Sequence, residues 1–233
     1  MLENLYTLFD KCEEIRYQAN LASAAKEGTF DFSEKNKNKY KVAHDNFLNK
    51  VSQHKYGETT PTGENIDAIK LYDIEVEEAS IIYMYTSHKI FNDVNYQLRN
   101  HTRKLDDDIY EYKNLLNASL DKLPAANNIT VFRDVKFPEG GIDACMKNFV
   151  DKVGLEIICK DFMSTHKSEG RWSDEETGFQ MVIKTCAKSR GKDLANLAFA
   201  VSEEEVLFKS GTKFIVNKVD VENTTIYLTE IIL

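Results

Sequence analysis

The sequence predicts an α+β protein from the distribution of its apolar and chain-breaking residues. Up to about Leu123, apolar residues recur every three or four positions, which is the spacing of one helix face. After Pro124, short β-branched and aromatic runs alternate with loops rich in Gly, Ser, Asp and Lys, as is typical of strands. Helices followed by strands predict a helical layer packed against antiparallel sheets.

The helices of the first part are predicted from apolar residues at helical spacing. The stretch Gly57–Asn65 is polar and carries both Gly and Pro, so it is predicted to be a loop between helices. The apolar positions are Leu2, Leu5, Leu8, Phe9 and Cys12, then Phe47, Leu48 and Val51, then Ala79, Ile82, Met84, Tyr85, Phe91, Val94 and Leu98, and finally Leu105, Ile109, Tyr112, Leu115, Leu116 and Leu120.

The strands of the second part are predicted from short apolar runs bounded by turn residues. A turn is expected where Pro138 and Glu139 precede two glycines. The predicted strands cover residues 129–132, 135–137, 156–159, 179–184, 206–208, 213–219 and 225–233.

Composition excludes several classes of protein. The chain has 233 residues, 42% hydrophobic and 29% charged, as in ordinary globular proteins. A net charge of −8 without a basic stripe argues against a duplex nucleic-acid binder, although it leaves a small nucleic-acid substrate open. Four cysteines and five histidines lack the spacing of a metal site. With no signal peptide or membrane span in the sequence, the protein is expected to be cytoplasmic as made, and any delivery into a target cell is left open.

Three short motifs in the second part carry candidate chemistry. Arg133 ends an apolar strand, Ser164-Thr165 follows an apolar run, and Glu203-Glu204-Glu205 leads directly into another strand. Each has an ordinary explanation when taken alone. The arginine suits a surface ion pair, the hydroxyl residues suit a turn, and the three glutamates suit a solvated loop beside a sheet edge. Their order and spacing carry more information than any one of them.

Taken together, these motifs resemble the Arg/Ser-Thr-Ser/Glu-x-Glu class of mono-ADP-ribosyltransferases, in particular the catalytic domain of clostridial binary toxins that modify actin. Residues 203–208 and 211–220 resemble the closing segment of that domain, and residues 156–165 its serine motif. Tyr85-Thr86-Ser87 and Asn95 to Arg99 resemble a helix of the same family. The resemblance covers residues 71–233, which are expected to be the catalytic core. Residues 1–70 are predicted to form an N-terminal helical region, and whether this region belongs to the same domain is left open.

The resemblance implies a fold in which N-terminal helices pack on two antiparallel sheets around a cleft for NAD. It implies transfer of ADP-ribose from NAD, as substrate and without a metal, to an arginine of a target protein, with release of nicotinamide. Glu205 would stabilise the cationic ribose, Ser164 would aim Glu205, Arg133 would bind the pyrophosphate, and Glu203 would orient the acceptor. If residues 203–205 are extended, Glu203 is predicted to project from the same side as Glu205, and Glu204 to point away from them toward solvent. The further NAD contacts that the resemblance implies are Thr165, Asn95, Arg99 and Trp172.

Two residues depart from the family pattern. His166 stands where the third residue of Ser-Thr-Ser is commonly serine, and Asp134 stands where some relatives carry a second arginine. Phe199 falls near the loop with which relatives touch their targets, and Phe179 is predicted to begin a core strand.

Three alternative functions remain open at the sequence level. One is an NAD glycohydrolase, in which water replaces the acceptor. Another is ADP-ribosylation of a nucleic acid, which the acidic charge disfavours. The third is a catalytically silent relative that binds a partner. The N-terminal helices could also dock the target, cap the cleft, or bind a neutralising or delivery partner.

Overall fold

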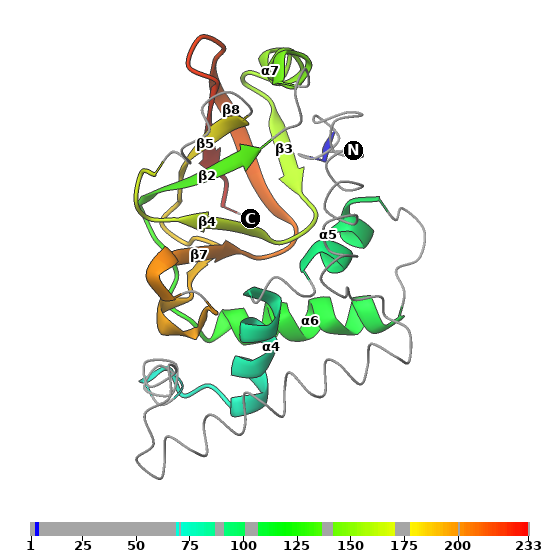
Figure 1. The fold of residues 1–233 in the computed structure, drawn as a ribbon, viewed down its shortest axis with the longest axis vertical. Coiled ribbons are helices and arrows are strands. Elements are labelled where there is room, and N and C mark those ends of the chain that lie inside the picture. The colour runs from blue at the N-terminus through cyan, green and yellow to red at the C-terminus, as the bar shows by residue number, and fades with distance from the viewer. Residues whose placement is uncertain are drawn as a thin grey trace. The chain divides into compact units, whose positions relative to one another are not determined.

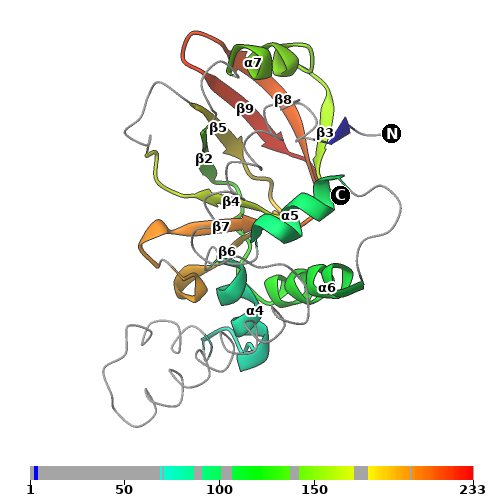
Figure 2. The same ribbon diagram turned by 45° about the vertical axis from the view of Figure 1, so that its right-hand side comes forward.

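In the computed structural model, the described residues are 3–4, 69, 71–86, 91–100, 107–136, 142–170, 178–199 and 201–232. The predicted helix around Phe47, the loop 57–65, the turn after Phe137, and Trp172 lie outside them. The described chain divides into two compact units, one helical and one built on a sheet (Figures 1 and 2). The predicted boundary at residue 70 is a different division and stays a prediction.

The helical unit contains α4 (Val76–Thr86), α5 (Phe91–Asn100) and α6 (Asp107–Asp121), with the short helices η3 (Ala195–Leu197) and η4 (Val201–Glu203). Helix α4 packs against α6 (Figure 1). Ile82 of α4 and Leu116 of α6 are fully buried. The Tyr112 hydroxyl donates to the carbonyl of Ile81 at 2.7 Å. Of the predicted apolar positions of α6, Leu115 is an exception at 45% exposed, whereas Ile109, Leu116 and Leu120 are buried. The apolar spacing therefore identified most of the packed positions of these helices.

The sheet unit contains one hydrogen-bonded sheet, in which nine strands of the described residues follow the order β1-β3-β8-β9-β5-β2-β4-β7-β6. The β1/β3 and β5/β9 pairs are parallel, and the other pairs are antiparallel. The strands are β1 (Glu3–Asn4), β2 (Thr130–Lys136), β3 (Glu156–Cys159), β4 (Met163–His166), β5 (Gly178–Lys184), β6 (Gly191–Asp193), β7 (Glu205–Phe208), β8 (Thr212–Asp220) and β9 (Thr225–Glu230).

The α+β class is confirmed, and the sheet corrects its details. The two separate antiparallel sheets expected from the resemblance are continuous here, because β2 and β4 are joined through one register pair, Phe132 with His166. On the far side of this join, β4, β7 and β6 form a group of three strands (Figure 2). Glu3 and Asn4 are also extended, not helical as the Leu2–Cys12 pattern predicted, because they pair with Ile157 and Ile158 of β3.

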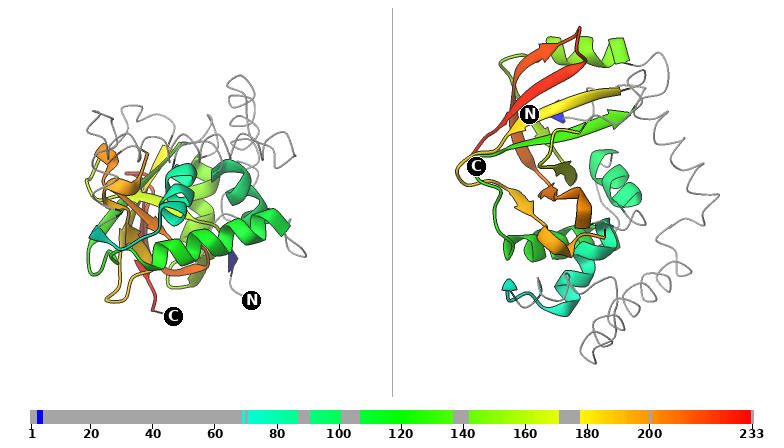
Figure 3. Two further views of the ribbon diagram at one scale, coloured as in Figure 1. Left: turned by 90° about the horizontal axis from the view of Figure 1, so that it is seen from below. Right: turned by 60° about the vertical axis from the view of Figure 1, so that its left-hand side comes forward.

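The core of the sheet unit lies between the strands and α7 (Ile142–Val150), a helix that the sequence analysis did not predict. Cys145, Met146 and Phe149 are the buried residues of α7. The Phe149 ring lies 6.2 Å from the ring of Phe179 on β5, and α7 contacts β8 (Figure 3, right). Phe179 is buried in β5, so its predicted place at the start of a core strand is confirmed.

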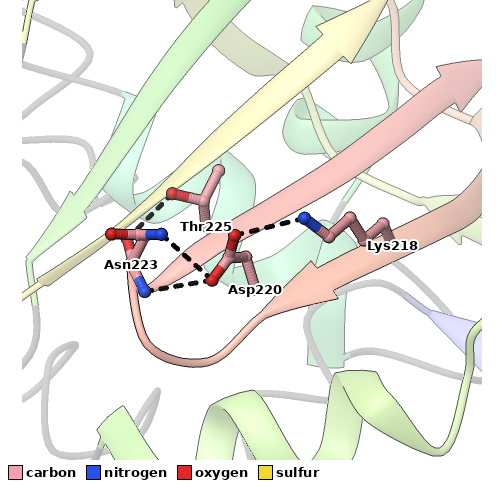
Figure 4. Close-up of polar contacts among 4 residues, drawn as sticks. All are labelled: Lys218, Asp220, Asn223 and Thr225. Carbon is pink, nitrogen blue, oxygen red and sulfur yellow. Dashed lines mark hydrogen bonds and ion pairs between the residues drawn. The ribbon is translucent and has the colours of Figure 1, made fainter.

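The hairpin between β8 and β9 is closed by polar contacts of Asp220 (Figure 4). Its Oδ1 accepts hydrogen bonds from the backbone amide of Asn223 at 3.1 Å and from the Asn223 side chain at 3.3 Å. Its Oδ2 lies 3.2 Å from the ammonium of Lys218. These donors, with the backbone amide as the largest cause, lower the pKa of Asp220 below its ordinary value.

Candidate active site

Strands β4 and β7 bring the serine motif beside the glutamate motif. In their antiparallel register, Ser164 lies opposite Leu207, Thr165 opposite Val206, and His166 opposite Glu205. Opposed residues of an antiparallel pair project from the same face of a sheet. Ser164, His166 and Glu205 therefore share one face, with Ser164 as the diagonal neighbour of Glu205. Such diagonal positions are about 7–8 Å apart, within reach of longer side chains.

Glu205 is the first residue of β7, and its side chain is 6% exposed. A buried carboxylate exerts stronger electrostatic effects than an exposed one, because little water screens it. It pairs with His166 of β4, and the rest of β7 is paired on both sides, which fixes its backbone more firmly than a loop would. The predicted catalytic carboxylate is thus buried and rigidly mounted.

Glu203 does not lie in the extended segment that the sequence analysis assumed. It ends η4, and Glu204 has a φ of 47°, in the left-handed region. The two-residue period that placed Glu203 on the same side as Glu205 therefore does not apply. Glu203 and Glu204 are both exposed, in contrast with Glu205. The predicted solvent exposure of Glu204 is confirmed.

Arg133 lies on β2 at the join between the two groups of strands. Its guanidinium Nη1 donates to the carbonyl oxygen of Ser164 at 2.7 Å, and its side chain is half-buried. The register of β2 with β5 places it opposite Met181. The structure thus brings Arg133 to the strand that carries the serine motif, and a charge-assisted bond to a carbonyl fixes it there. Its contact with a pyrophosphate stays a prediction.

Thr165 has a structural contact instead of an open position toward a ligand. It is 2% exposed, and its hydroxyl donates to the carbonyl of Val206 at 2.7 Å. It shares its face with core residues of β4 and β7, opposite to the face of Glu205. This bond gives Thr165 a structural role as a link between β4 and β7, and its predicted NAD contact stays a prediction.

The two residues that depart from the family pattern contact each other. His166 Nε2 lies 3.7 Å from Asp134 Oδ2, and Gln180 Nε2 donates to Asp134 Oδ1 at 3.1 Å. The sequence analysis noted His166 and Asp134 separately and did not identify Gln180. Gln180 is buried, and it is a polar residue within an otherwise apolar strand. This interruption of the apolar run was the available signal.

On the other side of β7, the short strand β6 supplies charged residues. Lys192 lies opposite Leu207, on the face that carries Glu205, and is 9% exposed. The Lys167 ammonium lies 2.6 Å from the Asp193 carboxylate, which links the end of β4 to β6. Of these residues, Lys192 is the one that the register places on the face of Glu205.

Asn95 and Arg99 belong to α5 of the helical unit. Asn95 is buried and exchanges two hydrogen bonds with the Tyr85 hydroxyl, at 2.9 and 3.2 Å. That exchange gives Asn95 a structural role within its unit, and Arg99 is half-buried. Phe199 is 50% exposed, and its ring packs edge-on against Tyr83. The NAD contacts of Asn95 and Arg99 stay predictions, as does that of Trp172.

Neither a metal site nor a membrane span is found in the described part of the chain. No three His, Cys, Asp or Glu residues within it are grouped to hold a metal ion. None of its helices is long and apolar enough to cross a bilayer.

Comparison with known proteins establishes the family. The family model described as "ADP-ribosyltransferase exoenzyme" matches residues 34–233, most of the chain. The chain belongs to this family. ADP-ribosyltransferases use NAD as the donor substrate, and the family includes toxins. No curated protein sequence matches this chain.

Solved structures share the fold of this ADP-ribosyltransferase at low identity. HopU1, an ADP-ribosyltransferase of Pseudomonas syringae pv. tomato, is 18% identical with a TM-score of 0.62, and the match covers 87% of this chain and 99% of HopU1. Plx2a, an ADP-ribosyltransferase toxin from Paenibacillus larvae, is 15% identical with a TM-score of 0.58, covering 79% and 97%. C3stau2 from S. aureus, whose structure contains NAD, is 16% identical with a TM-score of 0.55, covering 74% and 93%.

Proposed function

We propose that this ADP-ribosyltransferase moves ADP-ribose from NAD to an arginine side chain of a target protein, with Glu205 as its catalytic carboxylate. One observation carries the proposal. A buried glutamate at the start of β7 shares a sheet face with Ser164, while Arg133 is hydrogen-bonded to the backbone of that serine. These are the three residue types that cleavage of the nicotinamide–ribose bond needs.

The proposed chemistry follows from the charge that develops on the ribose. The bond between nicotinamide and ribose breaks with its electron pair leaving on nicotinamide, and the ribose becomes oxocarbenium-like. Glu205 faces this cation and accepts a hydrogen bond from a ribose hydroxyl. Ser164 supports Glu205 from the neighbouring strand. Arg133 binds two phosphate oxygens through its planar guanidinium, which a lysine would not reproduce.

The acceptor is assigned through Glu203. An arginine nitrogen attacks the anomeric carbon and loses a proton, and a carboxylate can orient its guanidinium bidentately. Glu203 is exposed, as a residue that meets an incoming protein must be. Phe199, half-exposed and five residues after Leu194, offers an apolar contact for that protein.

The test is mass spectrometry after incubating the purified protein with NAD and a cell lysate. Glu205→Gln should reduce labelling about 10²–10³-fold. Glu203→Gln should remove arginine labelling while NAD hydrolysis continues, and Glu204→Gln, which removes the same charge from the next residue, should change little. Labelling that survives in Glu203→Gln would contradict the arginine assignment.

The same experiment separates the other candidate activities. NAD consumption without a labelled acceptor would indicate a glycohydrolase. NAD consumption without labelled protein, but with ADP-ribose recovered on nucleic acid, would show that the acceptor is a nucleic acid and not a protein. A protein that neither binds nor consumes NAD would refute the proposal and favour a silent relative.

A further inference from the structure

A row of four polar side chains crosses the middle of the sheet unit on the face that carries Glu205. Gln180 is on β5, Asp134 on β2, His166 on β4 and Glu205 on β7, and these four strands are consecutive in the sheet. The register pairs Gln180 with Asp134 and His166 with Glu205. Figure 1 shows β2, β4 and β7 following one another in this order.

Asp134 is held in place from one side and faces His166 on the other. Its Oδ1 accepts from Gln180 Nε2 at 3.1 Å, and its side chain is 11% exposed. Its Oδ2 is buried and has no hydrogen bond among the described residues, while His166 Nε2 lies 3.7 Å from it. A buried carboxylate oxygen is costly unless a donor or a cation compensates it. His166 is the described group placed to do so.

His166 in turn stands between this carboxylate and Glu205. Directly opposed residues of an antiparallel pair have Cβ atoms about 4.5–5.5 Å apart, which is closer than the diagonal position of Ser164. A carboxylate on one ring nitrogen of a histidine fixes the ring plane and directs the other nitrogen. Because Nε2 lies toward Asp134, Nδ1 is the ring nitrogen that remains to interact with the Glu205 carboxylate.

We propose that Asp134 and His166 act as a pair that positions the Glu205 carboxylate, with Asp134 orienting the imidazole from 3.7 Å and the imidazole facing Glu205 across the β4/β7 register. The inference rests on the proposed catalytic role of Glu205. His166 is a positioning residue in this scheme, acting through Glu205 and not on NAD.

Among the described residues, three further charged side chains lie near His166 along the chain or across the sheet. Arg133 of β2 bonds to the Ser164 carbonyl, and Lys192 of β6 stands opposite Leu207 on the far side of β7. Lys167, next along the chain, is paired with Asp193 at 2.6 Å. Within the described strands on either side of β4, the carboxylates nearest to the ring in the register are Asp134 and Glu205.

The first test reads the contact without any turnover. In protein labelled with ¹³C-histidine, the ring resonance of His166 is the one missing from His166→Gln. At fixed pH, it should move in Asp134→Asn and also in Glu205→Gln, and stay in place in Glu156→Gln, an exposed glutamate on β3. A resonance that moves in Asp134→Asn but not in Glu205→Gln would overturn the proposal, whether or not the protein is a transferase.

The second test reads the consequence through NAD consumption. His166→Ala should lower kcat about tenfold with KM for NAD within about twofold, because a displaced carboxylate weakens the transition state more than binding. Adding Asp134→Asn to His166→Ala should cause no further loss, since residues that act as a unit are not additive. His166→Asn, which keeps a short side-chain N–H donor, should recover part of kcat.

The outcomes of the two tests are separable. Additive losses, or a raised KM with unchanged kcat, would overturn the positioning role. Equal thermal unfolding midpoints of the variants exclude general misfolding as the cause of lost activity. If the wild-type protein consumes no NAD, the proposed function fails, while the resonance of His166 still decides whether the contact with Glu205 exists.

Discussion

Replacing Thr165 by valine removes a hydroxyl at a site where the structure and the family resemblance assign different roles. The resemblance makes Thr165 an NAD contact, whereas its hydroxyl donates to the Val206 carbonyl at 2.7 Å in a site 2% exposed. Valine keeps the β-branched shape and the strand preference. The substitution therefore removes one hydrogen bond and little else.

The expected cost follows from that single bond. A hydrogen bond between neutral groups contributes about 0.5–1.5 kcal/mol net. For a chain of 150–250 residues, about 1 kcal/mol corresponds to a lower melting temperature by about 2–4 °C. We expect Thr165→Val to lower the melting temperature by about 2–4 °C and to leave the KM for NAD unchanged.

The assay combines thermal unfolding followed by circular dichroism with NAD kinetics below the melting temperature. Thr130→Val is the matched control, since Thr130 is an exposed strand position on β2 and should change stability little. An unchanged melting temperature together with a raised KM for NAD would refute the structural role and restore the ligand contact.

Three further predictions concern the sheet unit. Gly191→Ala should lower the free energy of unfolding, measured in urea, by about 1–3 kcal/mol. The reason is that a Cβ at this position would lie 2.9 Å from Cε1 of the Phe208 ring. An unchanged free energy of unfolding would refute this packing. Cys186 should be alkylated by iodoacetamide more slowly at pH 8 than a free thiol, since burial, and then Glu230, raise its pKa; an equal rate would contradict this. Asp220→Asn should destabilise the hairpin of Figure 4 at neutral pH. The lowered pKa of Asp220 makes its contribution complete above the ordinary value of about 4. The contribution is lost as the pH falls through the lowered value, so the variant and wild type should then unfold alike.

The sequence predicted those helices and strands whose own pattern of apolar residues indicates their secondary structure. Helices α4 to α6 show apolar residues at helical spacing, and β5 and β8 are long apolar runs close to their predicted bounds. Strands β4 and β6 lack such a signal. The four residues of β4 read Met-Ser-Thr-His, and β6 has three residues, Gly-Lys-Asp. Both are strands because β7 lies between them and pairs with each.

The candidate site likewise contains residues that the sequence could identify and contacts that depend on strand pairing. Residue type and order were enough to nominate Arg133, Ser164 and Glu205; Ser164 and Glu205 lie on paired strands, and Arg133 bonds to the backbone carbonyl of Ser164. Contacts that depend on register could not be read from the sequence. Asp134 and His166 meet because β2 and β4 cross at one register pair, and the two residues are far apart in the chain.

The step from Glu203 to Glu205 shows why a spacing of two does not by itself assign a common face. Alternation of side chains requires an extended backbone at all three residues. Glu204 instead has a φ of 47°, which costs a residue with a Cβ about 1–2 kcal/mol and redirects the chain between η4 and β7. The two carboxylates differ in exposure as a consequence, since Glu205 is 6% exposed whereas Glu203 is exposed to solvent. That difference suits two separate tasks, a buried carboxylate for the ribose cation and a solvated one for an incoming guanidinium. The acceptor assignment therefore depends on this exposure and on the comparison of Glu203→Gln with Glu204→Gln, and no longer on strand alternation.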